Sequence, residues 1–159
     1  MSGSVPLVHS TAATTAMRAA PIDPSWIVEG DPQARVSSLS RSADGRAWTD
    51  LWDCTAGRFR WHYALDETIH VLEGEATVID QTGRVWSLTP GDTVTFHHGT
   101  VAHWHVANYV RKVAFCHHPA PPPVAAFLHV TRTRIGRLAM GSLAAAVAML
   151  STVGISELV

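Results

Sequence analysis

Between residues 36 and 118, polar turn residues separate short runs that are either apolar or alternate between apolar and polar positions. The turn signals are glycine- and proline-containing sequences of the kinds that close hairpins and tight turns. They are Asp44-Gly45, Thr82-Gly83 and Pro90-Gly91-Asp92. No helical period lies between them. Regular short strands at this spacing predict an all-β sandwich or barrel.

The two ends of the chain have a different composition. Residues 1–20 are rich in serine, threonine and alanine, and they lack the charged start and apolar region of a secretory signal, so we expect a flexible tail. The proline-rich run at 119–123 predicts a stiff linker. The expected organisation is therefore a tail over 1–20, one β domain over 21–123, and a basic linker with a hydrophobic helix over 124–159.

The segment over residues 138–155 carries no charge, and its length is just sufficient for a membrane-spanning helix. Arginines at 132, 134 and 137 precede it, which by the positive-inside rule would leave the β domain in the cytoplasm. We therefore expect a cytoplasmic protein that this helix anchors to the inner face of the membrane. Its many alanines leave a second interpretation open, a helix that packs on the barrel or on a partner subunit.

Composition narrows the choice of partners. The 159 residues have room for one domain with a real core. With 12 basic and 13 acidic residues the net charge is -1, which gives no attraction to nucleic acid. Cys54 and Cys116 lie in apolar runs and are expected to be buried free thiols. The 10 histidines, most of them in the β region, are the compositional hint of site chemistry.

A candidate site lies on either side of a short turn. Strand alternation puts Arg60 and His62 on one face, and the turn at 64–66 would let Glu67 reach across to His62. One nitrogen and one oxygen ligand make half of a site for a first-row metal. The alternative is that His62 and Glu67 hydrogen-bond each other and close the turn.

These residues carry a resemblance to the cupin superfamily. The first cupin motif contains two histidines separated by one residue, then a glutamate and a closing glycine. His62 matches the second of these histidines, Glu67 matches the glutamate, and Gly74 matches the glycine. The runs SRSADG, LWDCTAGRFRWHY, DETIHVLEG, PGDTV and YVRKVAFCHHP further resemble the cupin subfamily related to (S)-ureidoglycine aminohydrolase. The resemblance implies a double-stranded β-helix, the jelly-roll barrel of cupins, and a divalent metal such as manganese as the cofactor.

The chain departs from the general cupin pattern at two ligand positions. Arg60 stands where the first histidine is expected, and an arginine does not give up its proton to bind a metal. Ala102 stands at the ligand histidine of the second motif and offers no ligand atom. His97 is the best spare ligand, since it lies in a loop at the rim. Strand alternation puts His103 and His105 on the face opposite Ala102.

We expect a barrel cavity lined by Trp52, Arg60, His62, Glu67 and Trp104. Two functions remain open. The favoured one is a cupin that binds a small metabolite, with Arg60, Trp52 and Trp104 contacting the ligand and with a degenerate metal site at His62 and Glu67. The alternative is a metal-dependent enzyme similar to (S)-ureidoglycine aminohydrolase that acts on a small nitrogen-containing metabolite.

The sequence also predicts a homodimer. A single small barrel has exposed strand edges, and Trp26, Trp48 and Trp61 are more aromatic surface than a monomer ordinarily leaves in water.

Overall fold

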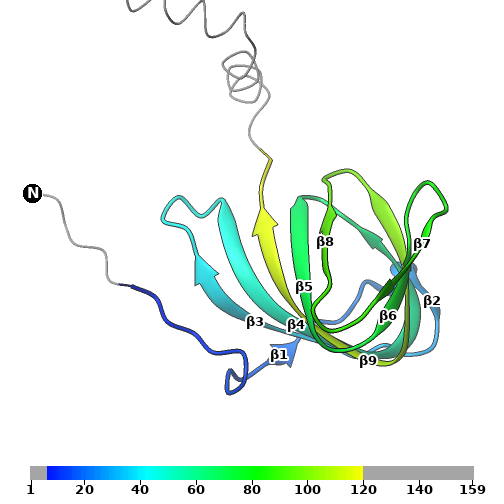
Figure 1. Ribbon diagram of the computed structural model, residues 1–159, viewed down its shortest axis with the longest axis horizontal. Helices are drawn as coiled ribbons and strands as arrows, with labels where there is room; N and C mark the ends of the chain where they lie inside the picture. Colours follow the sequence, from blue (N-terminus) through cyan, green and yellow to red (C-terminus); the bar gives the residue numbers. More distant parts are fainter. Residues whose placement is uncertain (1–6, 120–159) are drawn as a thin grey trace, which may run out of the picture. The chain divides into compact units, whose positions relative to one another are not determined.

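The structure, a computed structural model, describes residues 7–119, and these form strands joined by short turns (Figure 1). One turn of 3-10 helix, Pro24–Trp26, is the helical element of this part of the chain. The strands are β1 (Arg18–Ala19), β2 (Ile27–Glu29), β3 (Ala34–Arg41), β4 (Ala47–His62), β5 (Asp66–Gly74), β6 (Ala76–Ile79), β7 (Val85–Leu88), β8 (Thr93–Phe96) and β9 (Val101–His117). The all-β prediction is confirmed for these residues.

The strands pair antiparallel in the order β1-β3-β4-β9-β5-β8. In addition, β6 pairs with the first half of β9, β7 pairs with β6, and β2 pairs with the end of β4. The two longest strands, β4 and β9, pair with each other over almost their whole length and curve through the molecule (Figure 1). Because β9 pairs with β6 at one end and with β5 at the other, one strand serves both halves of the barrel. Glycines with positive φ sit at the predicted turns, including Gly45, Gly83 and Gly91.

The side chains of β4 that point into the core are even-numbered in the first part of the strand and odd-numbered in the second part. Trp52 and Cys54 are buried before Thr55, whereas Phe59 is buried after Gly57. The pairing of β4 with β9 is irregular between Thr55 and Gly57, where the register shifts. Such an irregularity moves every later side chain to the opposite face. This shift decides which predicted site residues reach the interior.

Aromatic rings fill much of the core. The rings of Tyr63 and Phe96 stack with centroids 4.4 Å apart, and those of Phe59 and Trp104 stack at 6.1 Å. Cys54 and Cys116 are buried free thiols, as the sequence predicts.

The tryptophans that motivated the dimer are not left in water. Trp26, Trp48 and Trp61 are partly buried and pack against the core, which removes that part of the argument for a dimer.

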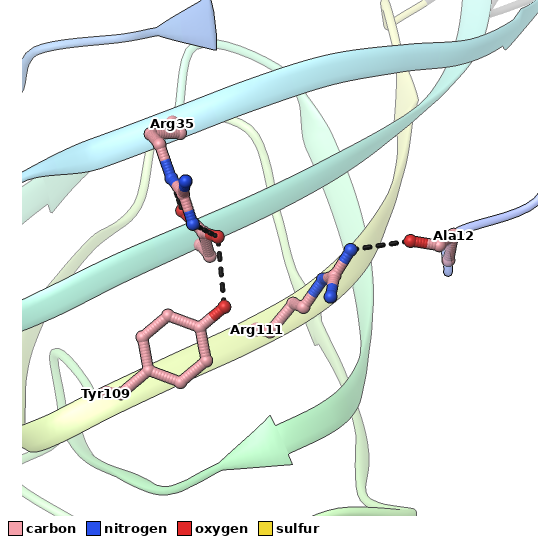
Figure 2. Close-up of polar contacts among 5 residues, drawn as sticks. Ala12, Arg35, Tyr109 and Arg111 are labelled. Carbon is pink, nitrogen blue, oxygen red and sulfur yellow. Dashed lines mark hydrogen bonds and ion pairs between the residues drawn. The ribbon is translucent and has the colours of Figure 1, made fainter. Parts of the chain in front are cut away.

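Polar side chains of β3, β4 and β9 form a cluster, and one of them, Arg111, reaches the N-terminal segment at Ala12 (Figure 2). Asp53 is 1% exposed and accepts hydrogen bonds from Arg35 Nε at 3.0 Å and from Tyr109 Oη at 2.9 Å. Burial, and then Asp53, raise the pKa of Tyr109. Arg111 donates to the carbonyl oxygen of Ala12 at 2.5 Å. The region expected to be a free tail over 1–20 thus contributes β1 and this contact.

The hydrophobic segment over 138–155 lies outside the described residues. Within residues 7–119, no helix has the length and apolar character that crossing a membrane requires.

Candidate functional site

A cavity of about 480 Å³ opens at one end of the barrel. This volume lies within the roughly 300–1,000 Å³ typical of small-molecule sites. Its lining comes from β1, β3, β4, β5 and β9 and includes the rings of Trp48, Trp52 and Trp61. The polar groups among these apolar walls include Glu67 and Lys112. Aromatic walls with a few polar groups are the usual composition of a ligand site.

Glu67 and Lys112 form a buried ion pair at this cavity. Lys112 Nζ donates a hydrogen bond to Glu67 Oε1, and the two side chains are 7% and 9% exposed for Lys112 and Glu67 respectively. The ammonium also lies 4.9 Å from the ring centroid of Trp52 and 5.6 Å from that of Trp104. A cation over aromatic faces is attracted by the ring quadrupole. The carboxylate and the two rings together compensate the buried charge of Lys112.

Tyr63 also lines this cavity. Its ring stacks on Phe96, and its Oη accepts a hydrogen bond from Trp104 Nε1 at 3.1 Å. Burial, and then the charge of Glu67, hold the pKa of Tyr63 well above its usual range. The hydroxyl therefore keeps its proton at neutral pH.

Cys116 also lines the cavity, and burial raises the pKa of its thiol to about 12. It is therefore a neutral thiol at physiological pH.

The structure does not bring Arg60, His62 and Glu67 together, contrary to the expectation from strand alternation. Glu67 is buried, but Arg60 and His62 are exposed. The reason is the register shift between Thr55 and Gly57, which turns the later even-numbered residues of β4 away from the interior.

His62 instead lies at the cavity rim. Its ring packs 4.9 Å from the ring of Trp26, and no hydrogen bond joins it to Glu67 in the part of the chain that the structure describes. Of the residues expected to contact a ligand, Trp52 is buried and lines the cavity, Trp104 is buried but is not among the residues that line it, and Arg60 is exposed.

The donor atoms in the interior do not fit the metal centre that the resemblance implies. Within residues 7–119, no three histidine, cysteine, aspartate or glutamate side chains converge as a metal site requires. Ala102 occupies an interior position, and His103 faces solvent. His97 is exposed and lies 3.5 Å from Asp66. Glu67, the one matching ligand position that is buried, is already paired with an ammonium group.

Sequence reasoning missed Lys112, although the sequence contains a signal for it. Lys112 is the only lysine of the chain. It shares its face of β9 with the buried residues Val110 and Ala114, and a lysine in the middle of an apolar stripe is a rare arrangement.

The comparisons with known proteins agree with this geometry. The family model of the EutQ-like cupin domain matches residues 41–114. Residues 41–114 thus form a domain of the cupin superfamily. No curated protein matches the chain.

Solved structures with a similar fold include the following two. A DUF861-family protein of unknown function from Pseudomonas syringae is 24% identical, with a TM-score of 0.60, over 65% of this chain and 45% of its own. The polyketide cyclase RemF from Streptomyces resistomycificus is 17% identical, with a TM-score of 0.53, over 74% of this chain and 83% of its own. This cupin thus spans less than half of the length of the Pseudomonas protein.

Proposed function

We propose that this cupin binds a small organic molecule in the barrel cavity, with the Glu67–Lys112 pair as its polar centre in place of a metal ion. The observation that carries the proposal is that this ion pair is buried at a cavity of about 480 Å³ and also contacts aromatic rings. Glu67 falls on the glutamate of the cupin metal motif. A fixed ammonium beside it supplies the positive charge that a metal ion supplies in other cupins.

The side chains at the cavity favour a ligand with an acceptor oxygen and an apolar body. An ammonium has three N–H donors, and Glu67 takes one of them. A carbonyl or carboxylate oxygen is a better partner for the remaining donors than an aromatic face. Tyr63 lines the same cavity, and its hydroxyl would be a second donor. The rings of Trp48, Trp52 and Trp61 would cover the apolar part of such a ligand.

The metal-dependent alternative, an enzyme similar to (S)-ureidoglycine aminohydrolase, has less support. It needs several protein ligands around one ion, and Lys112 would lie against that ion as a like charge. In a cavity of low dielectric constant this repulsion is costly. The donor set therefore favours a ligand-binding cupin with a degenerate metal site.

Tryptophan fluorescence tests the proposal, because three tryptophans line the cavity. The full-length chain is titrated with butyrate and, separately, with butan-1-ol, which has the same alkyl chain without the carboxylate. We expect saturable quenching by butyrate, weaker quenching by the alcohol, and loss of butyrate binding in the double variant Glu67→Leu/Lys112→Met. Arg60→Met, which removes an exposed positive charge, is the matched control and should bind normally.

Equal binding of butyrate by the wild type and by the double variant would show that the ion pair is not the polar centre. Absence of saturable quenching by either compound would count against a ligand site in the cavity.

A further inference from the structure

The chain uses arginine for every basic side chain except one. It has 12 lysines and arginines in total, and Lys112 is the one lysine among them. Lysine is usually among the most exposed residue types, yet this one is buried and has its ammonium at the Glu67 carboxylate. A purely structural cation could equally be an arginine, which suits buried ion pairs better. The position therefore points to a property that arginine lacks.

That property is the chemistry of a primary amine. Lysine can lose its proton and attack a carbonyl carbon, whereas the guanidinium of arginine stays protonated. Enzymes activate such lysines by placing them in apolar pockets, and a base within hydrogen-bond reach takes the proton. Lys112 has both features, because tryptophan rings contact its ammonium and Glu67 accepts its hydrogen bond.

We propose that Lys112 captures a small aldehyde or ketone as an imine inside the barrel. The inference rests on the proposed function, since the carbonyl compound must first enter the cavity. To the proposed binding function, the inference adds a covalent step and a chemical class of ligand, the small aldehydes and ketones.

The step balances without a further reactant. Glu67 takes a proton from the ammonium of Lys112, and the nitrogen lone pair attacks the carbonyl carbon. The carbonyl oxygen takes up a proton and becomes the hydroxyl of a carbinolamine. This hydroxyl then leaves with a second proton as water, while the nitrogen forms a double bond to the carbon. The net change is one carbonyl group and one ammonium group giving one protonated imine and one water.

The groups around Lys112 fit the species along this path. Tyr63 lines the same cavity, and its hydroxyl, which keeps its proton, would donate to the oxygen of the carbinolamine. The protonated imine carries its positive charge on the nitrogen of Lys112, so the rings of Trp52 and Trp104 would stabilise it as they stabilise the ammonium. Cys116 lines the cavity as a neutral thiol, because its pKa is raised to about 12, and it is a poor competitor for the carbonyl.

Reductive trapping tests the inference. The full-length chain is incubated with butanal and sodium cyanoborohydride at neutral pH, and the adduct is located by mass spectrometry of peptides. Because Lys112 is the only lysine, a lysine-specific protease cleaves the unmodified chain at this residue alone, and alkylation blocks that cut. We expect butylation of Lys112 in the folded protein to be at least about tenfold faster than in the same protein in urea, since general acid–base assistance typically gives 10²–10⁴-fold.

Variants separate the reactivity of the Lys112 amine from the access of butanal to the cavity. Lys112→Arg keeps the positive charge and should give no adduct on this residue. Glu67→Gln keeps the shape of the side chain but removes the base, and it should slow trapping at least about tenfold. Arg60→Met should react like the wild type.

The inference is overturned if Lys112 is butylated no faster in the folded protein than in urea. It is also overturned if Lys112 of the folded protein is not butylated at all. This comparison uses the wild type, so it holds even if a variant fails to fold. If butyrate still binds in the fluorescence titration, the binding proposal stands and only the covalent step fails. If butyrate binding is absent as well, both proposals fail.

Discussion

Removing one partner of the Glu67–Lys112 pair should destabilise the barrel far more than removing both. The two side chains are 9% and 7% exposed for Glu67 and Lys112 respectively, so the charge left behind by a single substitution has little access to water. Breaking a buried pair in this way typically costs about 3–5 kcal/mol. We expect that loss of unfolding free energy for Lys112→Met.

The double variant Glu67→Leu/Lys112→Met should recover most of this loss. Replacing a buried ion pair by apolar side chains of similar size is often neutral, or stabilising by about 1–4 kcal/mol. An internal comparison is the pair Arg58–Glu29, with an N–O distance of 3.4 Å and side chains 53% and 68% exposed. Exposed pairs of this kind contribute about 0–1 kcal/mol, so Arg58→Met should have a small effect.

Urea unfolding at neutral pH, followed by circular dichroism, measures four proteins: the wild type, Lys112→Met, the double variant Glu67→Leu/Lys112→Met, and Arg58→Met. The reasoning is refuted if Lys112→Met costs no more than Arg58→Met. It is also refuted if the double variant is as unstable as Lys112→Met, because the loss would then come from packing and not from an unpaired carboxylate.

Two further predictions concern the fold. A Cβ added at Gly57 would lie 2.7 Å from Cβ of Pro32, so Gly57→Ala should lower the unfolding free energy by about 1–3 kcal/mol through overpacking; an unchanged urea midpoint would contradict this. Burial raises the pKa of the Cys54 and Cys116 thiols from 9.0 to about 12, so the neutral thiols stabilise the fold below about pH 9, and this contribution is lost as the pH rises towards about 12. The urea midpoint should fall over this range, and less steeply in Cys54→Ala/Cys116→Ala; equal slopes would disprove the assignment.

Local patterns were sufficient to predict the class of fold. Glycine turns such as those at Gly45 and Gly83 adopt the positive φ that their sequences favour. The buried state of the two cysteines also followed from their apolar neighbours. These features depend on residues close in sequence, which is why a single sequence shows them.

The site could be predicted only in part, because its geometry depends on pairing between distant strands. Alternation from Trp52 places Arg60 inside, and only the pairing of β4 with β9 shows the register shift that turns it outwards. A clue was present in Gly57, since glycine inside a strand often marks an irregularity. The ion pair joins residues from β5 and β9, and nothing in the local sequence of Lys112 names Glu67 as its partner.

Metal content is the most direct test of the account, which holds that an ion pair occupies the polar centre of the barrel. The full-length protein is purified without chelator, dialysed against manganese and then against buffer, and analysed by elemental mass spectrometry beside Glu67→Gln. The account predicts that the wild type retains far less than one metal ion per chain and does not differ from the variant. One equivalent of manganese, zinc or iron in the wild type, lost in Glu67→Gln, would contradict it and restore the metal-dependent enzyme.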